Sequence, residues 1–106
     1  LYPQTPDDKA SSLQVEAEEA ANTYLPDESE GRRVAFRGIY VVGRREGATI
    51  DHCLQAFFLH PDEPNKAIDF LKAFMALREL GFPEPDISVA LIQVGHDRDK
   101  AIDLLM

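Results

Sequence analysis

Several kinds of residue are scarce in this 106-residue chain, and each scarcity excludes a class of structure. Cys53 is the single cysteine, so an internal disulfide framework is excluded and a reducing, cytoplasmic compartment suits the chain best. No run of 18 apolar residues occurs, so we expect no direct membrane insertion. The chain shows no signal peptide and begins with Leu1 rather than Met, and we expect it to be a segment of a longer protein.

Basic residues are also outnumbered, with 11 Lys and Arg against 19 Asp and Glu, for a net charge of −8. Residues 1–30 hold eight acids and one Lys, whereas residues 31–45 hold five Arg and no acid. Neutralising phosphates requires a dominant basic surface, so this balance argues against nucleic-acid partners. The arginine segment is expected to be a solvated face that pairs with the chain's own acids, or to bind an acidic patch.

The residues that carry catalytic chemistry are few and poorly spaced. His52 and Cys53 are neighbours, and a helix points adjacent side chains to different faces. No second cysteine gives the spacing of a zinc site, and His60 and His96 are expected to be polar surface or loop residues. The sequence therefore predicts no enzyme, no metal site and no cofactor.

Apolar spacing and turn residues predict a series of short helices. The segment 34–42 is rich in Val, Ile, Phe and Tyr, which fits a strand, but its apolar positions also repeat at helical spacing and favour a helix. An extended lead-in is expected over 1–11, a linker over 25–31 and a loop over 82–85. The predicted helices are 12–24 (marginal), 32–45, 49–59, 65–80, 86–94 and a last helix capped by Asp97.

A short repeat links two parts of the chain. The sequence Lys-Ala-Ile-Asp-Phe-Leu at 66–71 recurs 34 positions later as Lys-Ala-Ile-Asp-Leu-Leu at 100–105, with five of six residues identical. A fixed period of this size is typical of stacked helical units. Helix 66–80 is apolar nearly all round, as expected for a helix shared by two neighbouring units.

Residues 66–106 resemble the ubiquitin-associated (UBA) domain, a compact three-helix bundle. The resemblance rests on Leu80-Gly81-Phe82 after the first helix, on Ala90-Leu91 in the second, and on the segment from Asp97 to Leu105-Met106. The family usually has Met-Gly-Phe or Met-Gly-Tyr in this loop and a leucine pair at the end, so Leu80 and Met106 are conservative departures.

The resemblance implies that the loop and the end of the last helix contact the hydrophobic patch of ubiquitin. Gly81 permits the tight turn that presents Leu80 and Phe82. Packing within the bundle is the alternative role for Phe82 and Leu105, and a helix-dipole role is the alternative for Asp86. The predicted ubiquitin-binding residues are Leu80, Gly81, Phe82, Asp86, Asp103, Leu105 and Met106.

The repeat extends the resemblance to residues 32–71, which look like a diverged UBA-like unit that shares helix 66–80 with the UBA domain at 66–106. This arrangement is similar to the overlapping-UBA solenoid of the ubiquitin-associated subunit of the endosomal ESCRT-I complex. The first unit departs from the pattern because its loop is Glu46-Gly47-Ala48, which lacks both apolar residues. Residues 1–31 are expected to be an acidic lead-in with a marginal helix.

The sequence thus predicts an all-α bundle or solenoid that acts as a non-catalytic ubiquitin-binding adaptor. Its expected partners are ubiquitin or polyubiquitin and other subunits of a sorting complex, and the resemblance implies a role in endosomal sorting of ubiquitinated cargo. The alternative is a UBA-like docking scaffold that binds no ubiquitin. Exposure of Leu80, Phe82 and Met106 would favour the first hypothesis, and their burial against residues 12–24 would favour the second.

Overall fold

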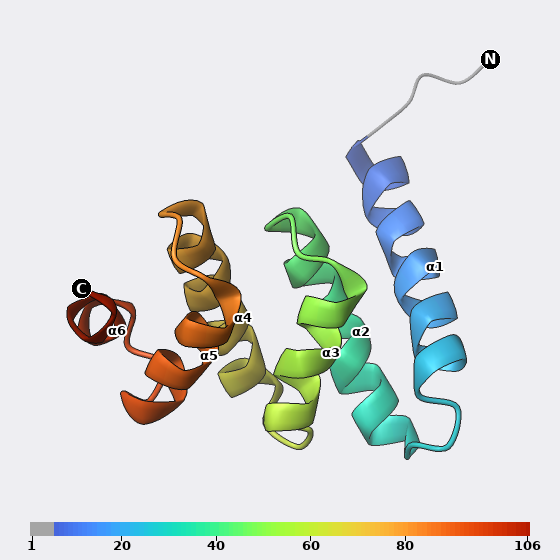
Figure 1. The fold of residues 1–106 in the computed structure, drawn as a ribbon. Coiled ribbons are helices and arrows are strands. Elements are labelled where there is room, and N and C mark those ends of the chain that lie inside the picture. Colours follow the sequence, from blue (N-terminus) through green and yellow to red (C-terminus); the bar gives the residue numbers. More distant parts are fainter. Residues whose placement is uncertain (1–5) are drawn as a thin grey trace.

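Six α-helices follow one another along the chain (Figure 1). The fold is that of a computed structural model, which describes residues 6–106 and the side chains from residue 12 onward, and this part of the chain contains no β-strand. The helices are α1 (Pro6–Tyr24), α2 (Glu30–Arg45), α3 (Ile50–Leu59), α4 (Pro64–Glu79), α5 (Glu84–Gln93) and α6 (Arg98–Leu105). The prediction of an all-α helical bundle is confirmed, and the segment 34–42 is helical.

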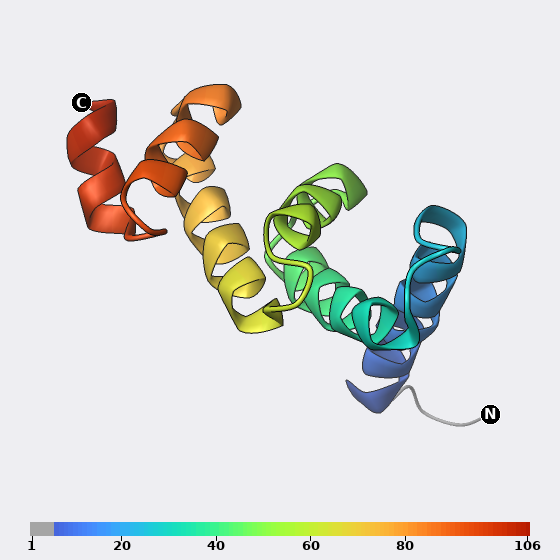
Figure 2. The same cartoon turned by 90° about the horizontal axis from the view of Figure 1, so that it is seen from below.

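Each helix packs only against its near neighbours in the chain. Helix α1 packs on α2, helix α4 packs on α2, α3, α5 and α6, and the hairpin pairs α2–α3 and α5–α6 complete the contacts. The helices therefore form a row from α1 to α6, as Figures 1 and 2 show. The radius of gyration is 15.0 Å, against about 13 Å for a rounded domain of this length, so the array is elongated.

Polar side chains cap three of the helices, two of them, at Thr49 and Asp97, as predicted. Ser29 and Asp97 each accept a hydrogen bond from the backbone N–H three residues later, at 3.3 and 3.1 Å. Thr49 forms a reciprocal capping box with His52, in which the Thr49 N–H donates to His52 Nδ1 at 3.0 Å. These bonds satisfy N–H groups that have no partner inside a helix.

Helices α1 and α5 begin earlier than predicted, and each has a proline in its first turn. Residues 6–11 were expected to be extended, yet α1 begins at Pro6; residues 1–5 of the expected lead-in lie outside the described part. Helix α5 begins at Glu84, inside the predicted loop 82–85, with Pro85 in its first turn. The first N–H groups of a helix lack an internal acceptor, so proline costs nothing there. The linker expected over 25–31 is shorter than predicted, since Ser29 caps α2 and the helix begins at Glu30.

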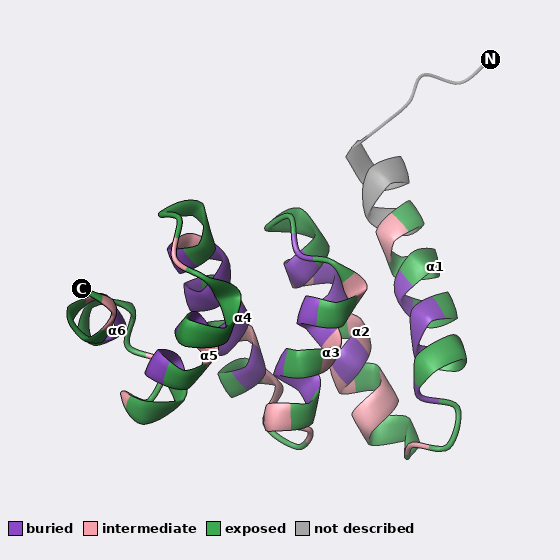
Figure 3. Cartoon of the chain, in the orientation of Figure 1, coloured by how far each residue is buried: buried purple, intermediate pink, exposed green. Residues whose placement is uncertain are grey.

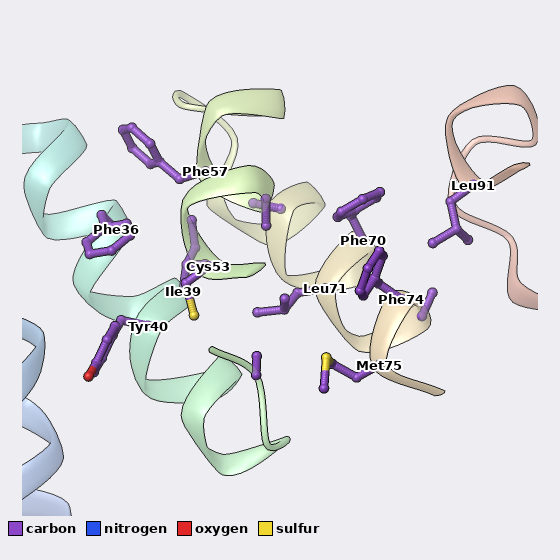
Figure 4. Packing of buried hydrophobic residues seen from close by; sticks show 14 of the residues in the cluster. Phe36, Ile39, Tyr40, Cys53, Phe57, Phe70, Leu71, Phe74, Met75 and Leu91 are labelled. Carbon is purple, nitrogen blue, oxygen red and sulfur yellow. The ribbon is translucent and has the colours of Figure 1, made fainter. Parts of the chain in front are cut away.

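Buried positions lie where the helices face one another (Figure 3), and aromatic side chains are prominent among the buried residues there (Figure 4). Phe36 of α2 meets Phe57 of α3 edge to face, with ring centroids 5.7 Å apart. Phe70 and Phe74 lie one turn apart on α4, with centroids 5.8 Å apart, and both are buried. Such pairs stabilise beyond the area they bury, by about 0.5–1.5 kcal/mol each.

Helices α2, α3 and α4 approach one another closely at Gly43. A Cβ at this position would lie 2.6 Å from Cys53 Sγ and 2.7 Å from Leu71 Cδ2, and both neighbouring side chains are fully buried. Glycine is therefore required here by space. The contact holds α2 against the helix hairpin that follows it.

Candidate functional site

The loop between α4 and α5 presents apolar surface to solvent. Leu80 caps α4 and is 63% exposed. Gly81 follows with φ +97°, a conformation that side chains rarely adopt, and it reverses the chain. Phe82 is partly buried and packs against the core, so it contributes less free surface than Leu80 does.

The end of α6 provides a second exposed apolar element. Met106 is 90% exposed and follows directly on the last turn. Leu105 is only partly buried and packs against the core, whereas Asp103 is exposed. Leu80 and Met106 thus follow different helices, α4 and α6.

A groove between α5 and α6 brings two of the predicted residues together. Its volume is 350 Å³, and its lining includes Asp86 near the start of α5 and Leu105 at the end of α6. The remaining predicted residues, namely Leu80, Gly81, Phe82, Asp103 and Met106, do not line this groove. The complete lining is Asp86, Val89, Ala90, Gln93, Leu104 and Leu105.

Val89 and Leu104 were not among the predicted binding residues. Both side chains are more than half exposed. Leu104 falls outside the core-facing set Ala101, Ile102 and Leu105 of the same helix. That spacing was visible in the sequence and could have identified Leu104 as an outward-facing leucine. Val89 lies one residue before the buried Ala90 and carried no comparable signal.

The corresponding loop between α2 and α3 has a different surface. Gly47 has φ +84°, so the turn resembles that at Gly81. Ala48, however, is fully buried, and its carbonyl oxygen accepts a hydrogen bond from Arg44 Nη1 at 3.2 Å. Glu46 is exposed. This loop therefore offers charge rather than apolar side chains.

Polar side chains bridge α3 and α5, whose backbones make no close approach. His52 accepts the Thr49 N–H at Nδ1, so its proton is on Nε2, which donates to Glu84 Oε1 at 2.9 Å. Arg78 Nε donates to the other carboxylate oxygen of Glu84 at 3.0 Å. The bond to His52, and then that to Arg78, lowers the pKa of the Glu84 carboxyl below its ordinary value. This network joins α3, the end of α4 and the start of α5.

The surroundings of Cys53 disfavour nucleophilic chemistry. Cys53 is fully buried, and burial raises the pKa of its thiol to about 11, so the nucleophilic thiolate is disfavoured. Among the described residues, no three His, Cys, Asp or Glu side chains converge closely enough to hold a metal ion by themselves. No helix of residues 6–106 combines the length and apolar character needed to cross a bilayer.

The N-terminal helix leaves the candidate site uncovered. Helix α1 packs on α2 and on no other helix of the described chain. The exposed residues Leu80 and Met106 are therefore not covered by residues 12–24. An array of short helices with apolar side chains exposed at a turn and at a helix end defines a small helical module suited to protein recognition.

Comparison with known families places the C-terminal part of this array. Residues 69–106, about a third of the chain, match the family model described as "Ubiquitin-associated protein 1, UBA2 domain". The match agrees in kind with the resemblance of residues 66–106 to the UBA domain. Neither a curated protein nor a solved structure matches the chain.

Proposed function

We propose that residues 66–106 form a ubiquitin-binding domain whose contact surface is built from Leu80, Gly81, Phe82, Leu105 and Met106. The observation that carries this proposal is the exposure of Leu80 and Met106, the two most exposed of the large apolar side chains in residues 66–106. Water contact with such side chains is unfavourable, and a hydrophobic patch on a partner would relieve it. The family match of residues 69–106 supports ubiquitin as that partner.

We further propose that the chain contains two overlapping three-helix units. The first comprises α2, α3 and α4 (32–71) and the second α4, α5 and α6 (66–106), with α4 shared. The packing of α4 against helices of both groups supports this division. Because Ala48 is buried and Glu46 is charged, only the second unit carries the proposed ubiquitin surface.

Binding at this single surface should be weak and reversible. A patch of this size would bury less than about 1,200 Å² in a complex, which is typical of transient contacts. Useful affinity would come from polyubiquitin or from other modules of the parent protein, through effective concentration. Asp86 and Asp103 are exposed beside the apolar residues and would orient a basic rim on the partner.

The cellular role that fits this binding is that of a cytoplasmic adaptor in endosomal sorting of ubiquitinated cargo, alongside other subunits of a sorting complex. The match to the UBA2 domain family of ubiquitin-associated protein 1 supports this role. A second candidate function is a docking scaffold that binds no ubiquitin. The partial burial of Phe82 favours this alternative, because that ring already packs within the domain.

An NMR titration of the isotope-labelled chain with monoubiquitin tests the proposal. Shifts should cluster on Gly81, Leu80 and residues 103–106. Replacing Leu80 with Asp removes an apolar side chain whose burial is worth about 1.5–3 kcal/mol, so affinity should fall by about 10- to 100-fold. Met106→Asp should act in the same direction.

Phe58→Ser is the matched control, because Phe58 is 60% exposed but lies on α3, outside the second unit. This variant should bind ubiquitin as the wild type does. Equal loss of binding in the control would refute the assignment of the surface to Leu80 and Met106. No shifts at millimolar ubiquitin would refute the receptor function and leave the docking scaffold. Circular dichroism of each variant checks that the helices persist.

A further inference from the structure

Two imidazole rings meet at a place away from the proposed ubiquitin surface. His60 ends α3, and His96 lies in the loop between α5 and α6. Their Nε2 atoms are 3.4 Å apart, and the planes of the rings are inclined by 73°. Both residues are partly buried, so the rings are neither freely solvated nor sealed inside the core.

Hydrogen bonds hold the backbone at both histidines. His96 is the single non-glycine residue of the described chain with positive φ, at 70°, and its N–H donates to Leu91 O at 2.8 Å. Its ring packs edge to face on Phe70, with centroids 5.3 Å apart. The N–H of His60 bonds to the carbonyl groups of Ala56 and Phe57 at the end of α3. The ring of His96 thus has a packing partner besides the ring of His60.

The separation of the two nitrogens matches one edge of a zinc coordination tetrahedron. Zinc binds imidazole nitrogen at about 2.0–2.1 Å, and two such ligands at the tetrahedral angle lie about 3.3–3.4 Å apart. Imidazole in its neutral form is a common ligand for such ions. We propose that His60 and His96 together form a binding site for Zn²⁺.

The surroundings of the pair suit a cation with solvent ligands. The rings line a pocket of 780 Å³ that is also lined by the carboxylate residues Asp69 and Asp97. Lys66 lines it too, but its ammonium pairs with Glu63 at 3.0 Å. The space allows water molecules to complete the coordination. With two protein ligands, the site should bind zinc more weakly than a closed four-ligand site does.

Zinc at this position would join two segments that are distant in sequence. The two histidines are 36 residues apart, one at the end of α3 and one after α5. Without metal, the two nitrogens can share a hydrogen bond only when one Nε2 carries a proton and the other does not. A zinc ion would replace that proton and link the two nitrogens. Because it would bind the folded chain and not the unfolded one, it should raise the unfolding midpoint.

The test is a titration of the whole chain with ZnCl₂, followed by NMR of the histidine ring nitrogens. We expect saturable, one-to-one changes at His60 and His96 and none at His52, whose ring is already hydrogen-bonded to Thr49 and Glu84. The unfolding midpoint should rise by several degrees at saturation. The His60→Gln and His96→Gln variants should each lose the saturable change and the rise in the midpoint.

Other outcomes would overturn the proposal. If millimolar Zn²⁺ causes no saturable change on these rings in the wild-type chain, the proposal is wrong whatever the variants show. Binding that survives both substitutions would place the ion elsewhere. Zinc-dependent dimerisation in analytical ultracentrifugation would show that the two histidines serve different chains rather than one intramolecular site.

Discussion

Two glycines of α2 give opposite predictions for the same substitution. Gly43 faces the contact of α2, α3 and α4, where an added methyl group would lie 2.6 Å from Cys53 Sγ and 2.7 Å from Leu71 Cδ2. Gly38 lies in the same helix, is exposed, and has no atom within 4 Å of an added methyl group. Replacing each glycine with alanine therefore isolates the effect of the close approach.

The expected magnitudes follow from two opposing terms. Alanine is favoured over glycine inside a helix by about 1 kcal/mol, and this gain applies at both positions. Overpacking of a well-filled core costs about 1–3 kcal/mol, and two overlaps at Gly43 place that site near the upper end. Gly43→Ala should thus destabilise the fold by about 2 kcal/mol, and Gly38→Ala should stabilise it by about 1 kcal/mol.

Thermal and urea denaturation followed by circular dichroism measure both effects. At about 4 °C per kcal/mol, the midpoint should fall by about 8 °C for Gly43→Ala and rise by about 4 °C for Gly38→Ala. The difference between the two variants equals the overlap term, since the helix-propensity gain cancels. If Gly43→Ala proves as stable as Gly38→Ala, the close packing of α2 against α3 and α4 is not the constraint we describe.

Three further predictions concern single side chains. The buried Cys53 thiol, with its pKa raised to about 11, should react with a thiol reagent only as fast as the chain unfolds, and rapid labelling in native buffer would contradict its burial. The pKa of the Glu84 carboxyl is lower in the folded chain than its ordinary value of 4.5, so the ionised carboxylate stabilises the fold at pH values above 4.5. This stabilisation is lost as the pH falls through the lowered pKa of the folded state. Urea denaturation from about pH 6 to about pH 3 should therefore show a shallower loss for Glu84→Gln than for wild type, and equal slopes would refute the role of its bonds to His52 and Arg78. Thr49→Ala removes the side-chain cap of α3 and should cost about 1 kcal/mol, measured by the same urea titration; an unchanged midpoint would show that the capping box adds nothing.

Local sequence signals predicted most of the helices. Thr49, Asp97 and Gly81 mark helix boundaries through caps and turns that depend on a few adjacent residues. The starts at Pro6 and Glu84 were placed too late, because proline was treated as a breaker where it occupied a first turn. The 34-residue repeat favoured a helix over a strand for residues 34–42, which residue composition alone did not.

The surface was harder to predict than the helices. The sequence identified Leu80 and Met106 as apolar residues at a turn and a chain end, and both are exposed. The sequence did not show that Phe82 is less exposed than these two residues, because the burial of Phe82 depends on packing between helices. The meeting of His60 and His96 depends on how α3 and the α5–α6 loop are placed in space, so spacing along the chain gave no indication of it.

The row of helices has a consequence for how the chain folds. Contacts that join only neighbouring elements close short loops, so little chain entropy is lost before each contact forms, and folding should be fast. Stability in such an array is close to a sum of local terms, and opening at one end need not spread to the other. Because α1 is attached through α2 alone, it should exchange its amide protons earlier than α4, which is held on both sides.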